Sequence, residues 1–292
     1  MDSVFATLTP TNVRAKVAFS EVFSAIMRDR QGASTNAAAH RMSVAAEQQY
    51  DADVLRFRRE MERKFSEGDS SESLTEPNTN TELEMQHMGM IWEGHYVLGF
   101  QPLPSVGREF SADINLCTSS FAKHCALNVR SLQARFSFDL QNRALFIASL
   151  TRSSLAGVAV NGEVVGRQMF SLNQHRMNIR IDSLEYEFQY TDFATTEAFS
   201  IRRKTYLGTN LNASPSPTFN MLTPHFNTRT IGRWTLNNPL GKGSAGRVFL
   251  ASNSKNQLVA IKVMECTSKS ARAVDIEIAR CRQLTALPCG TC

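Results

Sequence analysis

The sequence has no run of about 18 uninterrupted apolar residues, which is the length that a helix needs to cross a bilayer, so we expect no membrane partner. Its first residues, MDSVFATLTPTNVRAK, contain no basic segment followed by an apolar stretch. A secretory signal is therefore not predicted. We expect an intracellular protein, in the cytoplasm or the nucleus.

The chain has few cysteines and a small net charge. Six cysteines in 292 residues should be reduced thiols inside a cell. Cys289 and Cys292 form a C-x-x-C motif, but no second pair lies at zinc-finger distance, so no metal site is predicted. The formal net charge of +5 is small and dispersed, and no nucleic-acid partner is expected. The remaining composition is that of a globular protein with room for two domains.

Residues 1–90 are predicted to be helical and then disordered. The segment Ser43 to Phe65 is rich in helix formers, and five apolar residues fall near one face, namely Val54, Leu55, Phe57, Met61 and Phe65. The following residues, SEGDSSESLTEPNTNTELE, carry acidic side chains and no basic ones. Such a segment buries too little apolar surface to offset the entropy of ordering.

From Ile91 to Phe193 apolar residues recur with a period of two, as in Leu184, Tyr186, Phe188 and Tyr190. Short runs of this kind, separated by turn signals, predict an all-β sandwich over 91–193. Asn161-Gly162 between valines predicts a hairpin, because a type I′ turn needs positive φ at both central residues. Residues 194–228 contain three Ser-Pro or Thr-Pro dipeptides and no clear apolar period, and are predicted to be a linker.

The last segment, 229–292, carries the most specific motif. Gly241, Gly243 and Gly246 form G-x-G-x-x-G, which dinucleotide-binding folds also use. In those folds the glycines lead into a helix, whereas here RVFLAS and LVAIKVM predict two further strands. A glycine loop between antiparallel strands, followed by Val259-Ala260-Ile261-Lys262, is the arrangement of protein kinases.

This stretch resembles the amino-terminal lobe of a eukaryotic Ser/Thr protein kinase. The resemblance implies that the glycine loop covers the triphosphate of ATP, that Mg²⁺ accompanies the nucleotide, and that Val248 and Ala260 enclose the adenine. Lys262 and Glu277 would be the catalytic residues, with Glu277, or alternatively Asp275, holding Lys262 in place. The residues expected to contact ATP are Leu240, Gly241, Lys242, Gly243, Ser244, Gly246, Val248, Ala260 and Lys262.

The sequence contains no H-R-D, D-F-G or A-P-E motif, which a kinase needs for its catalytic base, its metal ligands and its substrate site. We therefore expect an incomplete lobe, no Mg²⁺ ligands from this chain, and no phosphoryl transfer by this chain alone.

The preceding β region resembles a forkhead-associated (FHA) domain, a sandwich that binds phosphothreonine. The matching residues are Gly107-Arg108, Asp113 to Leu116, Lys123-His124-Cys125, Gly157 to Gly162 and the run LEYEFQY. The resemblance implies a phosphate site in which Arg108 and Lys123 remain, while the other expected donors are replaced by Phe121, Ala122 and Ala156. His124 is expected to form a hydrogen bond within the scaffold.

Together, these features predict a mixed fold. It has a helical and disordered amino terminus, an FHA-like β-sandwich and a partial kinase lobe made of a sheet and one helix. The expected function is that of an ATP-binding, Ser/Thr kinase-like protein of the fungal checkpoint type. The alternative is a non-catalytic adaptor whose FHA-like domain binds a protein or phosphoprotein partner while the kinase segment is vestigial.

Overall fold

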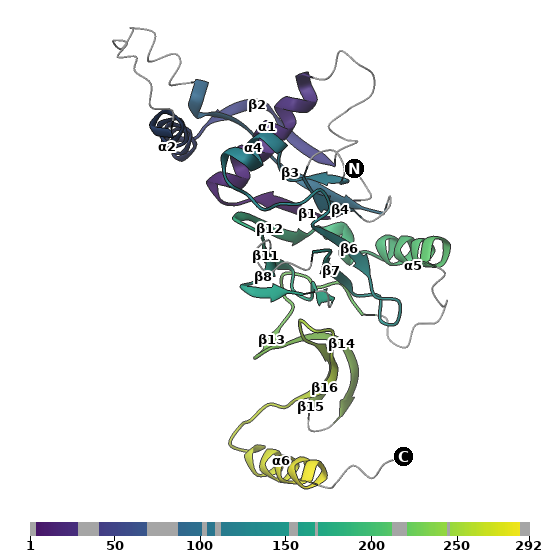
Figure 1. Cartoon of the computed structure of the whole chain (residues 1–292). Coiled ribbons are helices and arrows are strands. Elements are labelled where there is room, and N and C mark those ends of the chain that lie inside the picture. Colours follow the sequence, from purple (N-terminus) through teal and green to yellow (C-terminus); the bar gives the residue numbers. More distant parts are fainter. Residues whose placement is uncertain are drawn as a thin grey trace. The chain divides into compact units, whose positions relative to one another are not determined.

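The computed structural model describes residues 4–28, 41–68, 87–100, 104–108, 112–151, 157–166, 169–211, 221–243 and 246–286. The chain forms two compact units, Met1–Phe226 and Asn227–Cys292 (Figure 1). Both units are built mainly of β-sheet with a few helices. The sequence placed the start of the last segment at residue 229, and the second unit begins at Asn227.

The first unit contains two sheets. The seven-stranded sheet has the order β2 (Met42–Tyr50), β3 (Met90–Gly99), β1 (Val4–Pro10), β12 (Leu184–Tyr190), β11 (Arg176–Ile181), β8 (Val158–Val160) and β9 (Glu163–Val165). The five-stranded sheet has the order β10 (Phe170–Ser171), β7 (Leu145–Ser149), β6 (Ala134–Phe138), β4 (Ser105–Gly107) and β5 (Ile114–Asn115).

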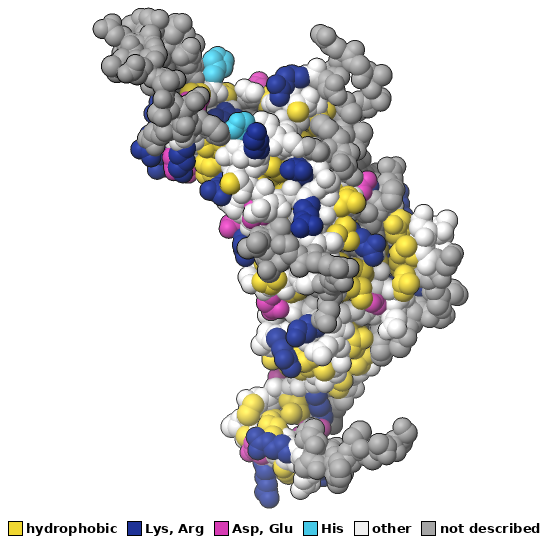
Figure 2. All heavy atoms as spheres, viewed as in Figure 1, with side chains coloured by type: hydrophobic (Ala, Val, Ile, Leu, Met, Phe, Trp, Pro, Cys, Tyr) yellow, Lys and Arg dark blue, Asp and Glu magenta, His cyan; other side chains and the backbone are white. Residues whose placement is uncertain are grey.

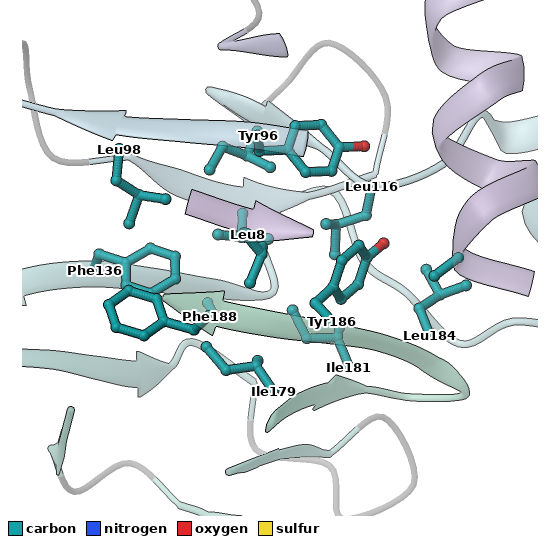
Figure 3. Packing of buried hydrophobic residues seen from close by; sticks show 14 of the residues in the cluster. Leu8, Tyr96, Leu98, Leu116, Phe136, Ile179, Ile181, Leu184, Tyr186 and Phe188 are labelled. Carbon is teal, nitrogen blue, oxygen red and sulfur yellow. The ribbon is translucent and has the colours of Figure 1, made fainter. Parts of the chain in front are cut away.

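The core lies between these sheets. Phe136 of β6 stacks on Phe188 of β12 with ring centroids 6.2 Å apart, so the two sheets face each other (Figure 3). The predicted alternation is confirmed in β11 and β12, where every second side chain is buried. Leu140, which follows the same period after Phe138, lies beyond the end of β6 and is exposed. The period of two in the sequence therefore arises from one buried face per strand.

The predicted hairpin between β8 and β9 is also confirmed. Asn161 and Gly162 have φ values of 48° and 82°, the positive values that a type I′ turn requires. Val160 and Glu163 are paired directly across this turn.

Three helices gather at one end of the first unit, α1 (Val13–Arg28), α2 (Ala52–Gly68) and α4 (Ser119–His124) (Figure 1). Phe19 of α1 is buried and meets Tyr96 of β3 edge to face, with ring centroids 5.0 Å apart. Asp51 caps α2 by accepting hydrogen bonds from the backbone N–H groups of Asp53 and Val54. These helices therefore belong to the same hydrophobic core as the sheets.

The prediction of a helical and then disordered segment over 1–90 is confirmed for α2 and wrong for β1 and β2, which are strands of the seven-stranded sheet. β1 is a central strand that pairs with both β12 and β3. Ser43 to Tyr50, predicted as the first half of a helix, is part of strand β2, and the helix begins only at Ala52. Pairing with β3 outweighs the helix propensity of this segment. The acidic segment beyond Gly68 lies outside the described residues as far as Gln86.

The prediction of a linker over 194–228 is wrong for its first half. Glu197–Leu211 forms helix α5, whose buried residues are Phe199, Arg203 and Leu207. Thr196 caps it, because its hydroxyl accepts a hydrogen bond from the backbone N–H of Phe199. The Ser-Pro residues at 214–217 lie outside the described residues.

The second unit is a four-stranded antiparallel sheet followed by one helix. The strand order is β13 (Thr230–Ile231), β14 (Trp234–Gly243), β15 (Gly246–Ser252) and β16 (Leu258–Val263), and the helix is α6 (Ala271–Ala286). None of the helices in the described part of the chain is both long enough and apolar enough to span a membrane.

Candidate functional site

The glycine motif lies at the tip of the β14–β15 hairpin. Gly243 and Gly246 are paired across the strands. Ser244, one of the expected nucleotide contacts, lies outside the described residues. Gly246 begins strand β15 rather than a helix. The strand–turn–strand arrangement expected from the sequence is therefore present, and the strand–helix arrangement of a dinucleotide fold is not.

The three glycines differ in what their surroundings allow. Gly246 has a φ of +148°, and a Cβ built there would lie 2.3 Å from the carbonyl oxygen of Val263. Only glycine fits this position without a shift of the backbone. A Cβ at Gly241 or Gly243 would meet no atom within 4 Å. The fold itself does not require glycine at these two positions, and the space beside them is open.

Four of the expected nucleotide contacts share one face of the sheet. Gly241 pairs with Val248, and Val248 pairs with Lys262, so their side-chain positions lie in one row. Ala260 precedes Lys262 by two positions in β16 and points the same way. Ala260 is exposed, whereas Val248 is half-buried.

Leu240 and Lys242 do not belong to this row. Leu240 lies within the register shift between Pro239 and Gly241 of β14 and is 51% exposed. Lys242 pairs with Arg247, and this pair directly follows the Gly241–Val248 pair along the two strands. Because successive side chains of a strand point to opposite faces, Lys242 lies on the face opposite Val248. The expected contact set is therefore divided between the two faces of the sheet.

Lys262 forms an ion pair with Glu277 of α6. The Lys262 Nζ lies 2.6 Å from the Glu277 Oε1, and both side chains are about one-third exposed, at 33% and 31%. Lys262 donates a hydrogen bond to the carboxylate, and this bond, with the attraction of its charge, lowers the pKa of Glu277. The contact expected between the strand lysine and the helix carboxylate is present, and it involves Glu277 rather than Asp275.

Helix α6 is otherwise loosely held. None of its described side chains is buried, and Ile276 and Ile278 are 46% and 39% exposed. Cys281 and Leu284 follow Glu277 at i+4 and i+7, a spacing that predicts a face packed against the sheet, but these side chains lie outside the described residues. The Lys262–Glu277 pair is a polar link between helix and sheet.

The charge and the open space beside the glycines fit the triphosphate part of a nucleotide. Lys262 supplies a positive charge on the face where Gly241 and Gly243 leave open space. No group of three or more His, Cys, Asp or Glu side chains that could hold a metal ion is found in the described part of the chain.

In the first unit, Gly107 ends strand β4 and Arg108 follows it. A Cβ at Gly107 would lie 2.0 Å from the carbonyl oxygen of Ser131, so this position requires glycine. The backbone N–H of Arg108 donates to the carbonyl of Arg130 at 2.8 Å. The Arg108 side chain is half-buried, and its Nε atom is buried with no hydrogen-bond partner among the described residues.

The residues beside Lys123 supply no further side-chain donors for the phosphate that the FHA resemblance implies. Lys123 is exposed on α4, but Phe121 and Ala122 are 2% and 1% exposed and belong to the core. The His124 Nδ1 and the Ser120 hydroxyl, both of α4, lie within hydrogen-bond distance at 3.2 Å. Ala156 lies outside the described residues. The helix therefore presents one cation here and buries the two positions that would carry further donors.

One residue of the hairpin was not singled out from the sequence. Arg247 lies directly opposite Lys242, and both side chains are exposed. This pairing follows from the pairing of Gly243 with Gly246, because a different register at the end of the hairpin would bring other residues opposite each other.

No protein-family model matches this sequence, and no curated protein matches it. The resemblance to FHA domains and to a kinase lobe that the sequence suggested therefore remains an expectation that rests on its motifs. What the chain does must be inferred from the arrangement of its own side chains.

Proposed function

We propose that the second unit binds ATP, with Mg²⁺ carried by the nucleotide, in the manner of a Ser/Thr protein kinase amino-terminal lobe. The observation that carries this proposal is the ion pair between Lys262 and Glu277, formed on the sheet face that also bears Gly241, Val248 and Ala260. In the kinase arrangement, a carboxylate on the helix that follows the strand holds the lysine where it can contact a phosphate. The Lys262–Glu277 pair matches this arrangement, whereas a lysine that is only solvated at the surface requires no carboxylate partner.

The chemistry of each residue follows from its position. Gly241 and Gly243 leave room for phosphate oxygens to approach the backbone N–H groups of the hairpin. Lys262 contributes a positive charge for the α- and β-phosphates, and Glu277 restricts the side-chain rotamers that binding would otherwise have to fix. Val248 and the small, exposed Ala260 offer an apolar surface on which adenine can lie.

The test is equilibrium binding of a fluorescent ATP analogue to the full chain, with and without Mg²⁺. We expect Lys262→Ala to weaken binding by about tenfold or more, because it removes a charge-assisted contact to phosphate. Lys255→Ala is the matched control, since Lys255 is an exposed lysine at the β15–β16 turn of the same sheet. Equal affinities for the unaltered chain, the Lys262 variant and the control would refute the proposal.

The alternative, a non-catalytic adaptor that binds a phosphoprotein through the first unit, is favoured by a single observation. Arg108 keeps a buried Nε atom with no partner among the described residues, as a residue awaiting an anion would. Against it, Phe121 and Ala122 are core residues rather than donors. Binding of phosphothreonine peptides that is lost in Arg108→Ala, together with unchanged behaviour of Lys262→Ala, would favour the adaptor.

A further inference from the structure

Two cations lie side by side at the tip of the β14–β15 hairpin, on the face opposite Lys262. Lys242 and Arg247 are direct partners across the antiparallel strands. Residues paired in this way point to the same face, with Cβ atoms about 4.5–5.5 Å apart. Both side chains are exposed, so the ammonium and guanidinium groups can meet a common ligand.

This pair is unfavourable for the free hairpin. Like charges placed directly opposite each other destabilise a sheet. None of the ion pairs in the described part of the chain involves Lys242 or Arg247. The neighbour of Arg247 on the next strand is Val263, which carries no charge. An anionic ligand would relieve this repulsion as well as gain its own attraction.

The same face continues as an apolar strip. Phe249 is two positions beyond Arg247 in β15 and pairs with Ile261 of β16, and Ile261 is followed two positions later by Val263. All three side chains are half-buried. Helix α6 supplies Glu277 to the other face, where Lys262 lies. The strip is therefore an apolar surface with two positive charges at one end.

We propose that this face binds an acidic polypeptide segment whose carboxylates pair with Lys242 and Arg247 and whose apolar side chains lie on Phe249 and Ile261. Charge complementarity selects an acidic partner, and the apolar strip selects one that also carries hydrophobic side chains. The site is separate from the nucleotide face, so the inference does not depend on ATP binding.

A polypeptide suits this surface better than a nucleic acid. Figure 2 shows Lys and Arg side chains scattered over the visible face rather than joined in one broad basic surface, and the net charge is only +5. A backbone of regularly spaced phosphates is held by many cations along its path. Two adjacent cations beside apolar residues match a short segment of alternating acidic and apolar side chains instead.

The experiment measures fluorescence anisotropy of a labelled peptide in which glutamate alternates with leucine, titrated with the full chain. We expect saturable binding that weakens with salt, and a loss of about tenfold in the double variant Lys242→Glu/Arg247→Glu. Lys255→Glu, on the same sheet, is the control, because it changes the net charge by the same amount as each of the two substitutions in the double variant. Its affinity for the peptide should stay within about twofold of that of the unaltered chain. A twin peptide with glutamine in place of glutamate should bind at least severalfold more weakly.

Three results would overturn the proposal. These are no binding of the acidic peptide, equal losses in the Lys255→Glu and Lys242→Glu variants, and tighter binding of a single-stranded oligonucleotide than of the peptide. Circular dichroism of each variant separates loss of the site from loss of the fold. Lys262→Ala should retain peptide binding, so failure of ATP binding and failure of this inference are distinguishable.

Discussion

Lys262 of β16 and Glu277 of α6 are fifteen positions apart in the chain, and their Nζ and Oε1 atoms are 2.6 Å apart. The described side chains of α6 include none that is buried. The ion pair between this helix and the sheet is partly exposed, and such pairs weaken in salt and in acid. The proposed nucleotide lysine could therefore lose this partner without unfolding of the sheet.

The first prediction is a pH-dependent release of Glu277. Its pKa lies below the ordinary value because Lys262 donates a hydrogen bond to it. A carboxyl whose pKa is lowered by folding stabilises the folded state above its unfolded pKa of about 4.3, and that contribution disappears as the pH falls through the folded pKa. A carboxyl NMR titration should give a low pKa for Glu277 that returns to the ordinary value in Lys262→Ala.

The control for this titration is Lys255→Ala, which removes an exposed lysine that has no contact with Glu277. Its Glu277 titration should match that of the unaltered chain. An unchanged Glu277 pKa in Lys262→Ala would mean that the ion pair does not form in solution.

The second prediction separates a structural glycine from a ligand-facing one. Gly246→Ala should lower the melting temperature, because its φ of +148° and the Val263 carbonyl 2.3 Å from the added Cβ both oppose alanine. Gly241→Ala should fold normally, since nothing lies within 4 Å of its added Cβ, yet it should weaken ATP binding severalfold by filling the space beside the phosphates. Thermal melts and analogue binding measure the two effects, and normal ATP binding by Gly241→Ala would argue against a phosphate at that place.

The sequence predicted the elements whose patterns are local. β11 and β12 bury every second residue, so their period of two is visible without any knowledge of their neighbours. The Asn161-Gly162 turn was predictable because few other dipeptides accept two positive φ values. For the proposed nucleotide site, the two-residue alternation of β16 placed Ala260 and Lys262 on one face in the same way.

The parts that were mispredicted depend on distant partners. β2 consists largely of helix-forming residues and becomes a strand because β3, which begins forty residues beyond its end at Tyr50, supplies its hydrogen bonds. In α5 the buried Arg203 interrupts the apolar period of the helix. That arginine is accommodated because its Nη1 and Nη2 donate to the carbonyls of Arg143 and Met221 at 3.1 and 3.2 Å. Neither interaction can be deduced from neighbouring residues.

The third prediction concerns α5 as part of the first unit. Phe199 is 2% exposed and its ring lies 5.6 Å from that of Phe5 and 5.2 Å from that of Phe100. Phe199→Ala should lower the free energy of unfolding by about 3–5 kcal/mol, because it leaves a cavity in this aromatic cluster. Ile201→Ala, on the same helix but 59% exposed, should change it by less than about 0.5 kcal/mol.

Urea denaturation followed by tryptophan fluorescence measures both variants. If residues 197–211 were a linker, as their sequence first indicated, the two substitutions would have equally small effects. A large difference between them would show that the helix is packed in solution.

The last prediction concerns the junction of α1 and α2. Asp51 accepts a hydrogen bond from Lys16 at 2.8 Å, in addition to the two backbone N–H groups of the α2 cap. Asp51→Ala should lower the free energy of unfolding by about 0.5–2 kcal/mol, the usual cost of losing a cap. Asp51→Asn keeps the cap acceptor and loses the charge, so it should cost about 0.2–1 kcal/mol, as for other partly exposed ion pairs.

Both partners of the Lys16–Asp51 ion pair make the free energy of unfolding depend on pH. Lys16 lowers the pKa of Asp51, so the carboxylate stabilises the fold above its unfolded pKa of about 3.9 and stops doing so as the pH falls through the folded pKa. Asp51 raises the pKa of Lys16, so the ammonium stabilises the fold below about 10.4 and stops doing so as the pH rises through the folded pKa. The free energies of unfolding of the unaltered chain and of Asp51→Asn, plotted against pH, should therefore differ by a constant amount between these limits and converge outside them. A difference that persists in strong acid would mean that the substitution acts through packing instead of charge.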